Sequence, residues 1–279
     1  MVIQTNIMAL NAYRQLSINQ NAMARAMERL ASGYRINRAG DDPAGLAISE
    51  KMRAQIKGLE MAEKNALDGI SLVQTAEGAM TEVHAMLNRM TELATQASNG
   101  IYDDDDREKL NAEFQQLKSE IDRISKATNF NGKNLLDGTL AKRSDGSGGL
   151  KLQIGDDAAS YNILGVNVND MSSKGLSLKD IDISTQKGAQ SAVDAIKNSI
   201  NTVSSQRASL GATQNRLEHT INSLGVSIEN IMAAESRIRD TDMAKEMMEY
   251  TRASILTQSS QAMLAQANMI PQGMLSLLR

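Results

Sequence analysis

The longest regular pattern in the sequence is a series of positions spaced alternately four and three residues apart between residues 196 and 238. Arg207, Gln214 and Glu235 occupy three of these positions. The others are all apolar: Ile196, Ile200, Val203, Leu210, Leu217, Ile221, Leu224, Ile228, Ile231 and Ile238. This spacing places one narrow apolar stripe along an α-helix, as in a coiled coil. The pattern therefore predicts a helix about 64 Å long, at 1.5 Å per residue, that packs against long partner helices.

Two further series with the same spacing predict the partner helices. The first is Ala76, Met80, Val83, Leu87, Met90, Ala94 and Ala97. It stops before Asn99-Gly100, a dipeptide typical of helix C-termini. The second is Leu110, Phe114, Leu117, Ile121 and Ile124. The acidic residues 103–106 precede it, and we expect them to cap that helix and to complement its dipole.

The middle of the sequence has a different pattern. Residues 132–188 are rich in glycine, and Leu150, Leu152 and Ile154 alternate with polar residues, which predicts a short β-strand. Val166 and Val168 indicate a second, weaker strand. Residues 146–149 (Gly-Ser-Gly-Gly) resemble a phosphate-binding loop only weakly, and we expect a hairpin tip there. The turn dipeptides at 131–132 and 137–138 end the preceding helical part.

The two ends of the chain are apolar over more of the helix circumference than the middle. Residues 3–34 and 241–279 are rich in Ala, Met, Leu, Asn and Gln. Each end alone offers too little partner surface to offset the entropy of ordering it. We therefore expect the ends to pair with each other and with other copies of the chain.

Composition narrows the functional classes. The chain has no Trp, only two Phe, and prolines only at 43 and 271, so long unbroken helices are allowed between them. A net charge of −3 without a basic cluster argues against binding to nucleic acid or to an anionic membrane. The absence of cysteine excludes disulfides and thiolate chemistry. The N-terminus, Met-Val-Ile-Gln-Thr-Asn, lacks the cationic region and apolar core expected of a secretory signal, and no stretch approaches the roughly 18 apolar residues that span a bilayer.

Catalytic chemistry is not visible in the sequence. His84 and His219 lack the His-Glu-x-x-His arrangement of a catalytic zinc site, and the acidic run lacks the glycine and glutamate of a calcium loop. The seventeen methionines could line an adaptable binding groove, but their helical spacing favours core or subunit contacts. We expect no metal, no cofactor and no enzymatic activity.

Several runs of residues in both halves of the chain are characteristic of one protein family. The N-terminal runs are residues 9–12 (Ala-Leu-Asn-Ala), 28–33 (Glu-Arg-Leu-Ala-Ser-Gly), 41–49 (Asp-Asp-Pro-Ala-Gly-Leu-Ala-Ile-Ser) and 74–78 (Gln-Thr-Ala-Glu-Gly). The C-terminal runs are 226–230 (Val-Ser-Ile-Glu-Asn), 234–240 (Ala-Glu-Ser-Arg-Ile-Arg-Asp), 260–268 (Ser-Gln-Ala-Met-Leu-Ala-Gln-Ala-Asn) and 277–279 (Leu-Leu-Arg). With these runs the chain resembles bacterial flagellin, the subunit of the flagellar filament. Tyr34 and Pro43 depart from the usual family residues, although Pro43 suits the first position of a helix capped by Asp42.

The resemblance implies a mainly α fold, a long antiparallel helical coiled-coil rod with a small β-hairpin region in the middle. It implies a terminal helix pair, D0, from residues 1–40 and 241–279, and a helical rod, D1, from 41–138 and 189–240. Residues 139–188 would form a short β-rich or loop insert, without large outer domains. The flagellin-like regions would span residues 5–140 and 193–278.

The function implied is structural self-assembly into an open helical filament for motility. The expected location is the extracellular filament, reached by type III export without a cleaved signal peptide. Expected partners are other subunits, an export chaperone, and cap and junction proteins.

Two alternative functions share part of this sequence pattern. A hook-associated junction protein resembles flagellin at both ends but usually diverges at the runs here found at 134–138 and 265–268, and those runs favour flagellin. A flagellin that carries a metalloprotease would need His-Glu-x-x-His and a longer middle region, which the sequence does not provide.

Residues 87–96 resemble the D1 helix that Toll-like receptor 5 binds in receptor-detected flagellins. The matched positions are Arg89, Leu93 and Gln96, with Glu113 on the following helix. Because Met90 and Ala94 occupy the coiled-coil stripe, we expect Arg89, Leu93 and Gln96 on an outward face of the helix. The alternative, in which they serve filament packing alone, stays open at this point.

Overall fold

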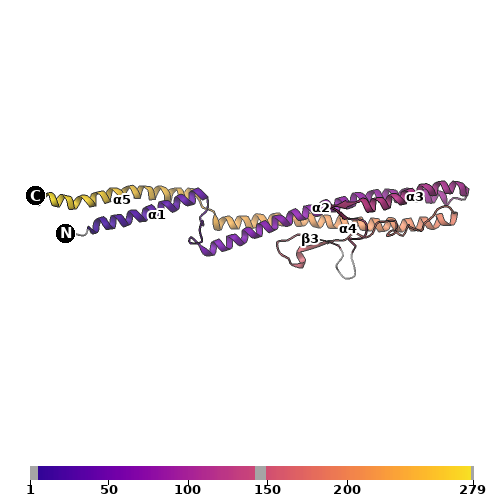
Figure 1. Cartoon of the computed structure of the whole chain (residues 1–279), viewed down its shortest axis with the longest axis horizontal. Helices are drawn as coiled ribbons and strands as arrows, with labels where there is room; N and C mark the ends of the chain where they lie inside the picture. Colours follow the sequence, from indigo (N-terminus) through magenta and orange to yellow (C-terminus); the bar gives the residue numbers. More distant parts are fainter. Residues whose placement is uncertain (1–5, 142–148, 278–279) are drawn as a thin grey trace. The chain divides into compact units, whose positions relative to one another are not determined.

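The computed structural model describes residues 6–141 and 149–277, without the side chains of 271–277, and the chain is mainly α-helical (Figure 1). The helices are α1 (Ile7–Ser32), α2 (Pro43–Ala97), α3 (Asp104–Ala127), α4 (Gln186–Arg239) and α5 (Met243–Leu277). Short strands β1 (Asn129–Phe130), β2 (Lys133–Asn134), β3 (Leu150–Gln153) and β4 (Ile163–Val166) and a 3-10 turn, η1 (Ser160–Asn162), lie between α3 and α4. The predicted fold class, long helices with small β-hairpins in the middle, is confirmed.

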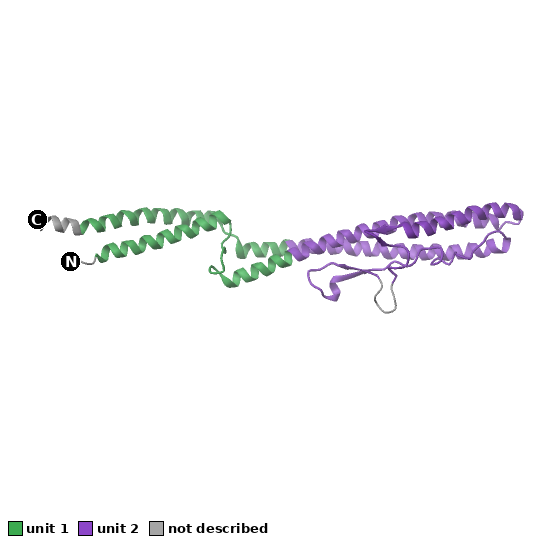
Figure 2. Ribbon diagram, viewed as in Figure 1, with its two compact units in different colours: residues 1–56, 229–279 green, residues 57–228 purple. Residues whose placement is uncertain are grey.

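The chain divides into two compact units, shown in different colours in Figure 2. Unit 1 consists of residues 1–56 and 229–279, and unit 2 consists of residues 57–228. The long helices α2 and α4 each contribute to both units.

Unit 2 contains a continuous hydrophobic core formed by α2, α3 and α4. All seven residues of the predicted stripe from Ala76 to Ala97 are fully buried, as are Phe114 and Ile121 of α3. The same core includes Ile196, Val203 and Leu210 of α4. Glu77 pairs with Arg207, and the Gln186 amide donates to the Ser98 carbonyl, so residue numbers rise along α2 as they fall along α4. The two helices are therefore antiparallel.

Unit 1 pairs α1 with α5, and the two helices also run antiparallel. Asn6 donates to the carbonyl of Ala267 at 2.8 Å, Asn19 donates to Ser260 at 2.9 Å, and Arg29 lies 3.5 Å from Glu246. The ends of the chain thus pair with each other, as expected from their composition. Figure 1 shows the two helices side by side.

Turn and capping residues act largely as predicted. Pro43 is the first residue of α2, and the Asp42 carboxylate accepts from the Gly45 amide at 3.0 Å. Asp103 occupies the cap position of α3 but makes no side-chain capping bond, so that part of the prediction is wrong. Asp104, Asp105 and Asp106 fill the first turn of α3, where their charge complements the helix dipole.

The small strands pair as two antiparallel hairpins. β3 pairs with β4, with Leu150 opposite Val166, while Val168 lies beyond the strand and is buried. β1 pairs with β2 around Asn131 and Gly132, both at positive φ, as a tight two-residue turn requires. The sequence indicated this turn but not its strands. The predicted glycine-rich tip at 146–149 lies outside the described residues except for Gly149.

Candidate assembly and recognition surfaces

The interface between α1 and α5 buries few side chains. Leu16 and Ala26 are the buried residues of α1, and small or polar residues such as Ala253, Thr257 and Ala267 are buried on α5. Glu246 is also buried and faces Arg29. Small residues allow close approach of the helices but remove little apolar area from water. The pairing of α1 with α5 is therefore thin compared with the core of unit 2.

Large apolar side chains instead point outward from these two helices. The exposed large hydrophobic residues of α1 and α5 are Ile7, Met8, Leu10, Tyr13, Ile18, Met27, Met243, Met247, Met248, Ile255, Leu256, Met263, Met269 and Ile270. They make up most of the exposed large hydrophobic residues found in the described part of the chain. An exposed apolar surface of this extent is typical of a face that another protein covers.

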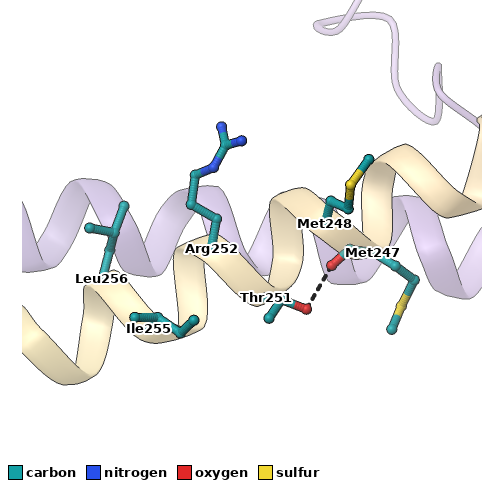
Figure 3. Close-up of a pocket in the computed structure, with 6 residues that line it drawn as sticks. All are labelled: Met247, Met248, Thr251, Arg252, Ile255 and Leu256. Carbon is teal, nitrogen blue, oxygen red and sulfur yellow. Dashed lines mark hydrogen bonds between the residues drawn. The ribbon is translucent and has the colours of Figure 1, made fainter.

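A groove on α5 concentrates this apolar character (Figure 3). It is lined by Met247, Met248, Thr251, Arg252, Ile255 and Leu256. These residues form two rows at helical spacing. The Thr251 hydroxyl donates to the Met247 carbonyl at 2.8 Å. Arg252 is the only charged residue that lines the groove.

In unit 1, the segment that connects α1 to α2 and the segment that connects α4 to α5 are joined by a short ladder of hydrogen bonds, which we call the clasp. Tyr34 and Asp240 form an antiparallel bridge. The Arg35 amide donates to the Arg239 carbonyl at 2.7 Å, and the Thr241 amide donates to the Gly33 carbonyl at 3.1 Å. The Arg239 guanidinium lies 4.7 Å from the centre of the Tyr34 ring, a cation–π contact. The unusual tyrosine at position 34 thus contributes to the clasp.

The apolar stripe of α4 faces the chain's own helices. Ile196, Val203, Leu210, Leu217 and Leu224 are buried. The remaining apolar positions, Ile200, Ile221, Ile228, Ile231 and Ile238, are half-buried. Leu217 packs with Ala66 of α2 and Leu164 of β4. The stripe therefore supports the fold of the chain itself, and a role of these residues as an assembly seam stays a prediction.

Three of the four residues of the predicted receptor surface lie on the outside of unit 2: Arg89, Gln96 and Glu113. Arg89 donates to Glu113 and to Glu92, each at 2.9 Å, and Gln96 donates to the Tyr102 hydroxyl at 3.1 Å. The hydrogen bond to Glu113 raises the pKa of Arg89 above its usual value. A shallow polar groove lies beside them, lined by Asn88, Thr91, Glu92, Thr95, Gln96, Asn99 and Tyr102.

The expected outward position of Leu93 is wrong. Leu93 is only 1% exposed and belongs to the same core cluster as Phe114 of α3. Helix α2 packs against α3 as well as α4, so the stripe through Met90 and Ala94 is only one of its buried faces. A pattern analysis based on one partner helix could not show the second contact.

Arg107 is a structural residue that the sequence analysis missed. It is 7% exposed, and its guanidinium donates to the carbonyls of Ala97 and Asn99 at 3.0 and 3.1 Å and to Asp104 at 2.8 Å. It therefore satisfies carbonyl groups that the end of α2 leaves without helical partners. The available signal was its position three residues before Leu110, on the extended apolar stripe of α3.

The two histidines differ in exposure. His219 is exposed and His84 is half-buried. Within the ranges 6–141 and 149–277, three or more potential metal ligands do not come together anywhere. In those same ranges, no helix has the length and apolarity needed to span a bilayer.

Two family models match the chain. Residues 3–141 match the bacterial flagellin N-terminal helical region, and residues 193–278 match the bacterial flagellin C-terminal helical region. A flagellin of Halalkalibacterium halodurans is 54% identical, and one of Bacillus subtilis is 52% identical, each with full coverage of both chains. A flagellar filament 31.3 kDa core protein of Treponema maltophilum is 43% identical, also over the full length of both.

Solved structures resemble the chain at lower identity. A putative flagellar hook-associated protein from Vibrio parahaemolyticus has a TM-score of 0.59 at 15% identity, covering 72% of this chain and all of that one. At that identity the likeness concerns the fold alone. A crystal structure of Bacillus cereus flagellin is 28% identical, with a TM-score of 0.48, over 58% of this chain and 88% of that one.

Proposed function

The chain belongs to the bacterial flagellin family and is a structural filament subunit, not an enzyme; we propose that α1 and α5 supply its main contacts with other subunits. The observation that carries the proposal is the exposed apolar surface of these two helices. Burying such side chains against a neighbouring copy contributes roughly 25 cal/mol for each Å² of apolar surface removed from water. The hook-associated alternative has no support beyond a shared fold.

We propose that the subunit divides into two regions, D0 and D1, at the helix interruptions that form the clasp. D0 would consist of residues 1–40 and 241–279, with α1 and α5 as its helices. D1 would consist of 41–138 and 189–240, with residues 139–188 as its short insert. The breaks between α1 and α2 and between α4 and α5 support these boundaries.

Elongation of filament seeds by purified subunits tests the proposal. Ile255 is 61% exposed on α5, so Ile255→Asp should leave the monomer folded and abolish elongation. Ile101, which is 84% exposed between α2 and α3, provides the matched control, because Ile101→Asp introduces the same charge away from α1 and α5. Equal elongation by both variants would contradict a main role for α5.

We further propose that the subunit reaches the extracellular filament by type III export, without cleavage of a signal peptide, and meets a chaperone and the cap and junction proteins on the way. The exposed apolar surface of α5 supports the proposal of a chaperone, because an unassembled subunit with that surface uncovered would tend to aggregate. Mass spectrometry of subunits from native filaments would check the export route. Loss of an N-terminal segment that includes part of α1 would contradict it.

Recognition by Toll-like receptor 5 is proposed for the outward residues of the candidate set, Arg89, Gln96 and Glu113. Their shared location at the α2–α3 surface supports it, and buried Leu93 is left out. Arg89→Ala should weaken receptor activation by monomer at least tenfold, equivalent to about 1.4 kcal/mol. Arg123 also forms an exposed ion pair, with Glu120 of α3, so Arg123→Ala is the control. An unchanged response to Arg89→Ala in a reporter assay would remove the receptor role and leave the filament function standing.

A further inference from the structure

Most of the exposed methionines among the described side chains lie in unit 1. Met80, Met90 and Met171 of unit 2 are fully buried, whereas Met61 of the same unit is 53% exposed. The exposed methionines described in unit 1 are Met8, Met27, Met232, Met243, Met247, Met248, Met263 and Met269, at 49–66%. Aqueous oxidants can therefore reach these thioether sulfurs, while the core of unit 2 shields those of Met80, Met90 and Met171.

Met247 and Met248 occupy a distinctive place among the exposed methionines. They are adjacent in sequence, and each begins one of the two rows of the α5 groove (Figure 3). Met247 is followed by Thr251 and Ile255, and Met248 is followed by Arg252 and Leu256, at i+4 and i+8. Both are half-exposed or more, at 50% and 64%. A change of polarity at this pair would alter both rows of the groove.

We propose that Met247 and Met248 form an oxidation-sensitive site on the unassembled subunit, with hydrogen peroxide as the reagent. The thioether sulfur attacks one peroxide oxygen, the O–O bond breaks, and an S=O bond forms. The sulfur is oxidised by two electrons, and the second peroxide oxygen leaves as water after taking the remaining proton. Methionine sulfoxide reductases reverse this modification.

The consequence rests on the proposed function, in which a second subunit covers this face of α5. A sulfoxide oxygen is polar, and burying it without a hydrogen-bond donor is unfavourable. Of the two side-chain donors that line the groove, the Thr251 hydroxyl already donates to the main chain, so only Arg252 remains for two sulfoxide oxygens. Oxidation therefore blocks addition of the subunit to a filament, and a subunit already assembled has its pair shielded.

Site-resolved mass spectrometry tests the reactivity. In peroxide-treated monomer, Met247 and Met248 should be oxidised at least tenfold faster than Met80, Met90 and Met171. In assembled filaments the rate at the pair should fall at least tenfold. Oxidation of the pair as slow as that of the buried methionines, or equally fast in monomer and filament, would overturn the proposal.

Seed elongation tests the consequence. Oxidised parent protein should elongate seeds at least tenfold more slowly than unoxidised protein, and reductase treatment should restore the rate. For the Met247→Leu/Met248→Leu variant, the ratio of rates after and before peroxide should stay near one. Met243→Leu/Met263→Leu removes two methionines of comparable exposure on the same helix, and it should stay sensitive.

Two results would overturn the role of the pair. One is normal elongation by parent protein that carries both sulfoxides. The other is equal loss of elongation in the Met247→Leu/Met248→Leu variant and the parent. Failure of the unoxidised parent to elongate seeds would instead reject the proposed function. The experiment therefore distinguishes a wrong filament function from a wrong role of Met247 and Met248.

Discussion

Arg107 shows how one side chain can fix the connection between two helices. Its planar guanidinium has several donors in a fixed geometry, which lets it reach the carbonyls of Ala97 and Asn99 together with Asp104. The hydrogen bond to Ala97 is buried, so that carbonyl would be shielded from water if its donor were removed, whereas the Asp104 side chain is exposed. The charge is retained inside the fold because each of the three guanidinium nitrogens donates a hydrogen bond.

Replacing Arg107 should destabilise unit 2. Arg107→Met removes the donors and should lower the free energy of unfolding by about 3 kcal/mol, whereas Arg107→Lys should have a smaller effect. Urea denaturation measures both. Lys109 forms an exposed pair with Asp106, so Lys109→Met is the control and should change stability by less than about 1 kcal/mol. Similar losses for Arg107→Met and Lys109→Met would contradict the capping role.

Asp41 should titrate below its usual pKa because two main-chain amides donate to its carboxylate. The amide of Arg38 is the larger cause and that of Asn37 the second, and both donate to Oδ2. The folded loop favours the charged form, so its stabilisation is complete above the unfolded pKa, the ordinary value of 3.8. It is lost as pH falls through the lower folded pKa.

An NMR titration of the Asp41 carboxyl and the Arg38 amide should show a shared midpoint below 3.8. Asp41→Asn should remove this transition from the Arg38 amide. A midpoint at or above 3.8 would show that the two amides do not stabilise the carboxylate.

At the scale of elements, introducing an aspartate should destabilise the protein much more on the apolar stripe of α4 than on the solvent-exposed face of the same helix. Leu217 is fully buried against α2 and β4, and Leu217→Asp should cost about 3–5 kcal/mol of unfolding free energy. Asn215 is exposed two residues earlier, and Asn215→Asp should cost less than about 1 kcal/mol. Denaturant titration and filament yield would check both variants. Equal stability would mean that the assigned register of α4 is wrong.

The elements that the sequence predicted best are the long helices in which one apolar stripe contacts the same partner helix along its whole length. The stripes of α2 and α4 are visible because every fourth or third residue meets the same antiparallel partner. Leu93 was misplaced because α3 adds a second contact surface that no single stripe encodes. The strands β1 and β2 are only two residues each, so the Asn131-Gly132 turn was detectable while its strands were too short to show alternation.

Candidate surfaces were harder to predict than the fold. The outward residues Arg89, Gln96 and Glu113 came from the resemblance and not from periodicity. The α5 groove depends on which face of α5 meets α1, and small buried residues such as Ala253 and Thr257 decide that. Small residues carry little signal in a hydrophobic pattern, so the exposed pair Met247 and Met248 could not be located from the sequence.

At the scale of the whole molecule, the two units should differ in local stability. Unit 2 has a core of fully buried apolar residues, whereas α1 and α5 share few buried side chains. Backbone amides of α1 and α5 should therefore exchange with solvent far faster in the monomer than those of α4 between Ile196 and Leu224. Hydrogen exchange by mass spectrometry measures this. Strong protection of α1 and α5 in monomer would contradict it, while protection gained only on assembly would support it.

The clasp has a mechanical consequence. Both covalent connections from the terminal helices to α2 and α4 pass through it, at residues 33–42 and 240–242. Tension on either connection therefore acts on strands held together by the ladder bonds of Gly33, Arg35, Arg239 and Thr241. When force acts along the direction of the two segments, all the hydrogen bonds between them carry part of it at the same time. When force pulls the segments apart sideways, the hydrogen bonds break one after another. The two connections between the terminal helices and the long helices of this filament subunit are thus linked to each other, so that tension on one is shared with the other.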